Sequence, residues 1–127
     1  MMQAIGYALC AACLIIVAGV VGRTWVDGKR TPQRLALTLL PSMLAPIAAA
    51  TVTSADWYVV PVIALVASLA VYAASCLVHR KAEKYNVQGE SRAKHRWFHR
   101  SKAFSDVAFG LFNGIPFALF AFAVAAL

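Results

Sequence analysis

Two cysteines and two histidines have the spacing of a redox pair and of a metal-ligand pair. Cys10 and Cys13 are three residues apart, but they lie in an apolar stretch with no nearby cation to stabilise a thiolate. His95 and His99 are four apart, so a helix places them on one face. Lysine and arginine flank them, and no cysteine or carboxylate completes a tetrahedral ligand set. We predict packing roles for the cysteines and no metal site.

An acidic residue inside a membrane span would favour an ion-coupled transporter, and Asp106 is the nearest candidate. Residues 107–127 are long enough to cross the hydrocarbon alone, which places Asp106 at the membrane surface, four residues after Lys102. The sequence has no glycine-rich phosphate loop and no nucleophile with a matching base. We therefore predict no catalytic residue, no cofactor and no enzymatic activity.

Small residues recur at helical spacing in the last apolar stretch. Gly110 and Gly114 are four apart, and Ala118 continues the row, so one helix face forms a groove where another backbone can approach closely. A similar ladder occupies the first apolar stretch: Ala4, Ala8 and Ala12. Two interpretations stay open, because such faces pack either against a partner or copy, or against the protein's own helices.

Asn113 lies beside the glycine row, roughly 10 Å into the apolar region by the rise of a helix. Pro116 removes the hydrogen bond to the carbonyl of Phe112, four residues earlier. An amide at that depth needs a partner, so we expect Asn113 to form a hydrogen bond to another helix beside this kink, with a ligand site as the alternative.

The elements that must position these residues are apolar helices. The chain has 127 residues, 61% hydrophobic and 13% charged, and except for Asp56 its charges fall in two blocks, residues 23–34 and 80–106. Apolar stretches of about twenty residues separate the blocks, as a membrane-spanning helix requires. The pattern predicts an all-α integral membrane protein forming a single domain of four transmembrane helices in two hairpins. The helices are expected over residues 3–22, 32–53, 58–78 and 103–127, with basic loops over 23–31 and 79–102.

The basic residues also predict the orientation of the chain. The two charged blocks, residues 23–34 and 80–106, together contain all twelve lysines and arginines, whereas the short hairpin near residues 53–58 and both termini contain none. Because basic residues in short loops stay in the cytoplasm, we expect both termini outside and both basic loops inside. A net charge of +7 is then a topology signal rather than evidence of nucleic-acid binding. The expected location is the bacterial inner membrane.

The second basic loop predicts a contact with anionic lipid headgroups or with a cytoplasmic partner. Each lysine or arginine near an anionic surface contributes on the order of 1 kcal/mol. The expected contact residues are Arg92, Lys94, Arg96, Trp97, Arg100 and Lys102.

Three functional hypotheses fit these features. The first is a non-enzymatic subunit or accessory protein of a larger inner-membrane complex, with its small-residue helix faces as lateral interfaces. The second is a self-assembling pore former of the holin type. The third is a small transporter or channel, which only the prolines and Asn113 favour. The expected partners are anionic lipid and other membrane subunits or further copies of the chain.

Overall fold

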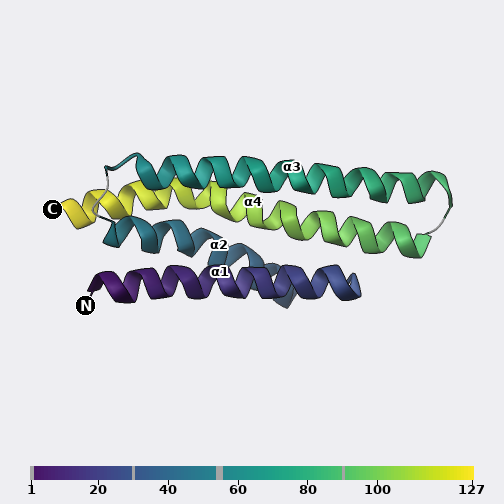
Figure 1. Cartoon of the computed structure of the whole chain (residues 1–127), viewed down its shortest axis with the longest axis horizontal. Coiled ribbons are helices and arrows are strands. Elements are labelled where there is room, and N and C mark those ends of the chain that lie inside the picture. The colour runs from purple at the N-terminus through teal and green to yellow at the C-terminus, as the bar shows by residue number, and fades with distance from the viewer. Residues whose placement is uncertain (1, 30, 54–55, 90) are drawn as a thin grey trace.

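Four long helices make up the chain. The computed structural model describes residues 2–29, 31–53, 56–89 and 91–127 (Figure 1). Its helices are α1 (Met2–Asp27), α2 (Pro32–Val52), α3 (Val59–Val87) and α4 (Ser91–Ala126). Each is long and apolar enough to cross a membrane, so the predicted set of four apolar helices is confirmed. The centre of the expected hairpin, residues 54–55, lies outside the described residues.

Local sequence signals set the ends of these helices. Thr31 is extended (φ −122°, ψ 158°), and its hydroxyl accepts a hydrogen bond from the backbone N–H of Arg34, which caps α2 before Pro32. Gly28 follows α1 with a φ of +65°, and Gly89 follows α3 with a φ of +78°. Glycine enters this left-handed region without steric penalty, so the chain can turn at both positions.

The prediction of a basic loop over residues 79–102 is wrong. Residues 79–87 continue α3 and residues 91–102 form the first turns of α4, so most of the segment is helical. The segment contains no proline, and Gly89 is its only glycine. Lysine, arginine, alanine and glutamate favour helix, so both helices extend beyond their apolar residues into the charged segment. In the same way α1 continues to Asp27, beyond the expected end at residue 22.

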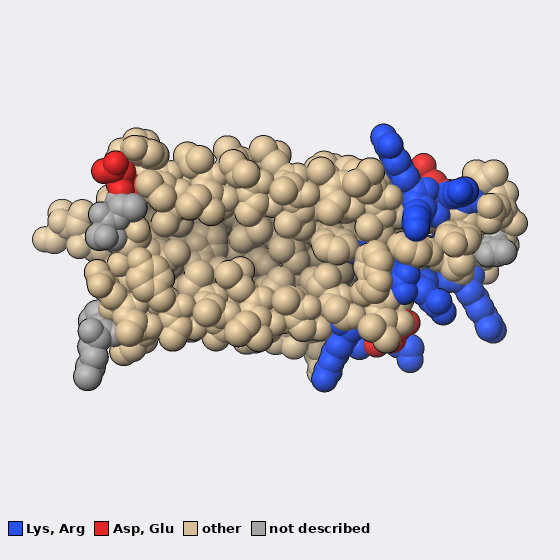
Figure 2. Space-filling view, viewed as in Figure 1, with Lys and Arg blue, Asp and Glu red and all other residues tan. Residues whose placement is uncertain are grey.

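The two hairpins lie side by side, with α4 next to α2. The helices follow the order α1, α2, α4, α3 across the molecule, and α1 and α3 do not pack together in the described part of the chain (Figure 1). Both chain termini lie at one end. The described lysines and arginines gather at the opposite end, where α1 and α3 finish and α2 and α4 begin (Figure 2). We call this the charged end.

The glycine row of α4 forms the contact between the hairpins. A Cβ added to Gly110 would lie 2.7 Å from the Cβ of Ser42 and 2.8 Å from the carbonyl oxygen of Leu39. A Cβ on Gly114 would lie 2.8 Å from the carbonyl oxygen of Met43. Such separations are below van der Waals contact, so only glycine allows the backbones of α4 and α2 to approach this closely.

Serine and proline residues line the α2 side of this contact. Ser42 and Pro46 are buried there, Pro41 is buried elsewhere along the same helix, and the Ser42 hydroxyl donates to the carbonyl of Thr38 at 2.6 Å. Each internal proline removes one helical hydrogen bond. The hydroxyl bond keeps a buried polar group satisfied within its own helix.

We predict that Gly110→Ala destabilises the fold and that Gly19→Ala does not. Alanine favours a helix by about 1 kcal/mol over glycine, but overpacking a close contact costs about 1–3 kcal/mol. Nothing lies within 4 Å of the Cβ position at Gly19, so that variant is the matched control. Unfolding by SDS in mixed micelles, followed by tryptophan fluorescence, measures the difference. Equal stability of the two variants would contradict the close contact.

Candidate functional site

At the charged end, the Arg100 guanidinium contacts two tryptophans. Its central carbon lies 4.7 Å from the ring centroid of Trp25 and 4.5 Å from that of Trp97. The two rings meet edge to face, with centroids 5.4 Å apart. Arg100 also donates from Nε to the backbone carbonyl of Trp25 at 2.7 Å. That carbonyl lies in the last turn of α1, where helical partners are missing and a cation is favoured.

Helix α3 adds a further cation and a further ring to this group. The Lys81 ammonium lies 4.7 Å from the Trp97 centroid, and the ring of Tyr85 stacks on Trp97 at 6.5 Å with an interplanar angle of 15°. Phe104 meets the edge of Trp25 at 6.1 Å. Cation–π contacts at partly exposed sites contribute about 0.5–1 kcal/mol each. We call this group the tryptophan cluster, and it ties α1, α3 and α4 together.

The turn after α1 is held by the same stretch of α4. A hydrogen bond of 2.8 Å joins Nδ1 of His99 to the carbonyl oxygen of Gly28. A Cβ at Gly28 would lie 2.5 Å from Cγ of Arg96, so this arginine packs directly over the glycine. His99 is therefore used in helix docking. Around His95 and His99, the described residues provide no group of three potential metal ligands.

Asp27 closes the same turn from the α1 side. Its carboxylate accepts two hydrogen bonds of 2.7 Å from the Arg34 guanidinium and one of 3.0 Å from the backbone N–H of Lys29. The bonds from Arg34, and then that from Lys29, hold the pKa of Asp27 well below its usual range. The hydrogen bonds between Asp27 and Arg34 keep the beginning of α2 beside the end of α1.

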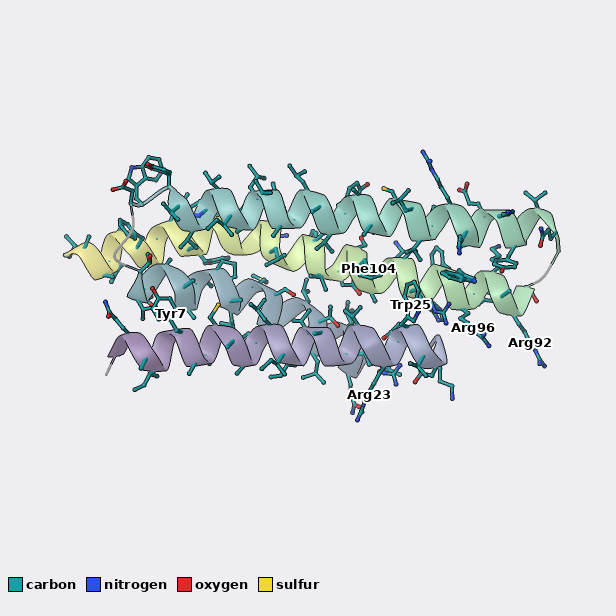
Figure 3. All side chains as sticks on the ribbon, viewed as in Figure 1. Tyr7, Arg23, Trp25, Arg92, Arg96 and Phe104 are labelled. Atoms are coloured by element: carbon teal, nitrogen blue, oxygen red, sulfur yellow. The ribbon has the colours of Figure 1, made fainter. Side chains whose placement is uncertain are left out.

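The six residues expected to contact lipid or a cytoplasmic partner have different surroundings. Trp97 and Arg100 are half-buried in the tryptophan cluster, and Arg96 lies over Gly28 at the same end of the molecule (Figure 3). Arg92 is exposed and points away from the helices, Lys94 is half-buried, and Lys102 is exposed. The first three hold helices together, whereas Arg92 and Lys102 remain open to outside partners.

Sequence reasoning missed the cluster residues on the other helices, which are Trp25, Lys81 and Tyr85. Trp25 lies more than seventy positions before Trp97, and no periodic pattern links the two. The one available signal was that a tryptophan lies two residues after Arg23 at the end of an apolar stretch, as in an interfacial aromatic belt.

The two expected small-residue faces have different surroundings. Gly110, Gly114 and Ala118 are buried, with the two glycines against α2, so this chain itself occupies that groove. The alanine ladder of α1 is exposed along its length: Ala4, Ala8 and Ala12.

Asn113 is half-buried, but its amide stays on its own helix. Nδ2 donates to the carbonyl of Phe109 at 2.7 Å. That carbonyl lies one turn before Asn113 on the same face, whereas the carbonyl of Phe112, freed by Pro116, belongs to the adjacent residue. The amide is thereby satisfied without a second helix. Cys10, Cys13 and Cys76 are free thiols, and Cys13 is buried at 5% exposure.

An open apolar trough runs between α1 and α3 in the part of the molecule away from the charges. It has a volume of about 270 Å³, with α1 and α3 as walls and mainly α2 as the floor. Figure 2 shows the molecule hollowed between its upper and lower helices. Most lining residues are small or aliphatic, among them Cys10, Leu14, Ala45, Ala49, Ile63 and Ala67. Such a surface suits packing against another apolar helix.

Comparison with known proteins gives no family. The chain matches no family model, no curated protein and no solved structure. The functional inference therefore rests on the geometry of the trough and of the charged end.

We predict that Arg100→Gln loosens the attachment of α4 to the end of α1. The variant loses two cation–π contacts and a charge-assisted hydrogen bond, together about 1–2 kcal/mol. Hydrogen exchange of the backbone amides at residues 25–29 should rise about tenfold. Arg92→Gln removes the same charge from an exposed side chain and should leave exchange unchanged. Equal exchange in both variants would show that Arg100 does not hold the turn.

Proposed function

We propose that this chain is a non-enzymatic, multi-pass subunit or accessory protein of a larger complex in the bacterial inner membrane. The observation that carries the proposal is the open trough between α1 and α3. The first support is that all four helices can cross a membrane.

The distribution of charge supports a cytoplasmic location for the charged end. Basic residues are retained on the cytoplasmic side during insertion, so both termini and Asp56 face outside in this proposal. Helix α4 has 36 residues, about 54 Å at 1.5 Å per residue. This exceeds the 30 Å hydrocarbon thickness, so the α3–α4 hairpin projects into the cytoplasm.

The trough is the place where a partner helix completes the packing. A four-helix bundle closes around its core when each helix has two neighbours. Here the row of helices leaves α1 and α3 without mutual contact in the described residues, and the apolar space between them stays open. One transmembrane helix of a partner, seated between them, would give α1 and α3 the missing neighbour.

The lining of the trough fits a helix with larger apolar side chains. Ala45, Ala49 and Ala67 line it and let a second helix approach, because packing between membrane helices depends on close van der Waals contact. The exposed ladder of Ala4, Ala8 and Ala12 offers a second, lateral face on α1.

We predict that Ala67→Phe blocks the partner and that Ala73→Phe does not. Ala67 is half-buried in the trough wall, whereas Ala73 is exposed on another side of α3 and does not line the trough. A photo-crosslinking amino acid at residue 67 should label one membrane protein in cells, and the same group at residue 73 should not. In gentle detergent, Ala67→Phe should reduce recovery of that protein at least tenfold.

Other outcomes contradict the proposal in distinct ways. Equal labelling from residues 67 and 73 removes the trough as the interface. A large homo-oligomer whose expression alone collapses the membrane potential supports a pore former instead. Circular dichroism and gel filtration of Ala67→Phe confirm that any loss of partner is not a loss of fold.

A further inference from the structure

A second groove follows the seam between α3 and α4, and it changes from cationic to apolar along its length. Its polar part has a volume of about 440 Å³ and is lined at the charged end by Ser75, His79, Arg80, Phe98, Ser101 and Lys102. Its apolar part has a volume of about 270 Å³ and includes Leu69, Phe109 and Phe112. Tyr72 and Ser105 line both parts, so the two are continuous.

Residue size creates the groove. Ser68, Ser75, Ser101 and Ala108 are buried at 3–7% exposure where α3 meets α4. Along the apolar part, larger side chains stay exposed and form the walls: Leu69 at 60%, Tyr72 at 56%, Phe109 at 60% and Phe112 at 57%. Small residues in the contact and large ones beside it leave a channel that a flexible hydrocarbon chain can fill.

The polar part carries positive charge at the boundary of the apolar segment. The Lys102 ammonium lies 5.5 Å from the ring centroid of Phe98, another lining residue. Among the described residues, Arg80 has no ion-pair partner. No acidic residue is part of the described lining, although Glu83 contacts the lining residue His79 at 3.3 Å. The groove therefore offers the cations of Arg80 and Lys102 to an anion.

We propose that this groove binds one anionic phospholipid, with its phosphate between Arg80 and Lys102 and an acyl chain along Tyr72, Phe109 and Phe112. The cationic and apolar parts of the groove follow one another as the phosphate and acyl chain of a phospholipid do. A phospholipid in the inner leaflet has its phosphate at the charged end and its chain toward the membrane centre. This site lies outside the trough and does not depend on the proposed partner. It also differs from the tryptophan cluster, whose Arg100 is already engaged.

Native mass spectrometry of the full chain, titrated with phosphatidylglycerol or phosphatidylethanolamine, tests the charge requirement. Wild type should bind phosphatidylglycerol about tenfold more tightly, and R80Q/K102Q should bind both lipids equally. The control R23Q/R92Q removes the same charge from two exposed residues outside the groove and should keep the preference. Equal binding of both lipids by wild type, or the same loss in both double variants, would overturn the proposal.

The acyl part is tested separately with phosphatidylglycerol that carries a photoactivatable group in one chain. Labelling should concentrate on residues 68–72 and 108–112, and S105F, placed where the two parts join, should reduce it at least fivefold. Glycerol phosphate, which lacks chains, should bind far more weakly than the lipid. Uniform labelling of all four helices, or full binding of glycerol phosphate, would show that no lipid chain occupies the seam.

Discussion

The close approach of α4 to α2 is the contact on which the rest of the structure depends. At Gly110 and Gly114 the two backbones lie nearer than any side chain would allow. Lipid tails and neighbouring helices are equally apolar surroundings for a side chain, so the hydrophobic effect does not drive membrane helices together. Close van der Waals packing must do so. Because α4 also packs along α3, this contact fixes α4 as the central helix and joins the two hairpins.

Placing α4 in the centre leaves apolar space on either side of it. The row of helices does not close, so α1 and α3 border a trough, and the α3–α4 seam carries a groove of a different character. The trough is lined by small and aliphatic, uncharged residues and suits a helix. The seam runs from cations to aromatic rings and suits an amphipathic molecule. Two surfaces with different chemistry thus follow from one packing order.

The basic residues of the charged end divide between internal and external roles. Arg100 and Arg34 make hydrogen bonds that hold α1 to α4 and α1 to α2. Arg80, Arg92 and Lys102 keep their side chains exposed. One set of basic residues therefore both builds the folded turn and leaves exposed cations at the charged end.

The sequence by itself determined four apolar helices, the cap at Thr31 and the turns at Gly28 and Gly89, because these depend on local composition and backbone preference. The high density of charged residues predicted a loop over residues 79–102. These residue types also favour helix, so α3 and α4 continue through most of the segment. Only the tertiary structure decided that α2 fills the glycine row, that Trp25 meets Trp97, and that Arg80 lies across a groove from Lys102. Those pairs are distant in the chain, and packing order rather than sequence spacing brings them together.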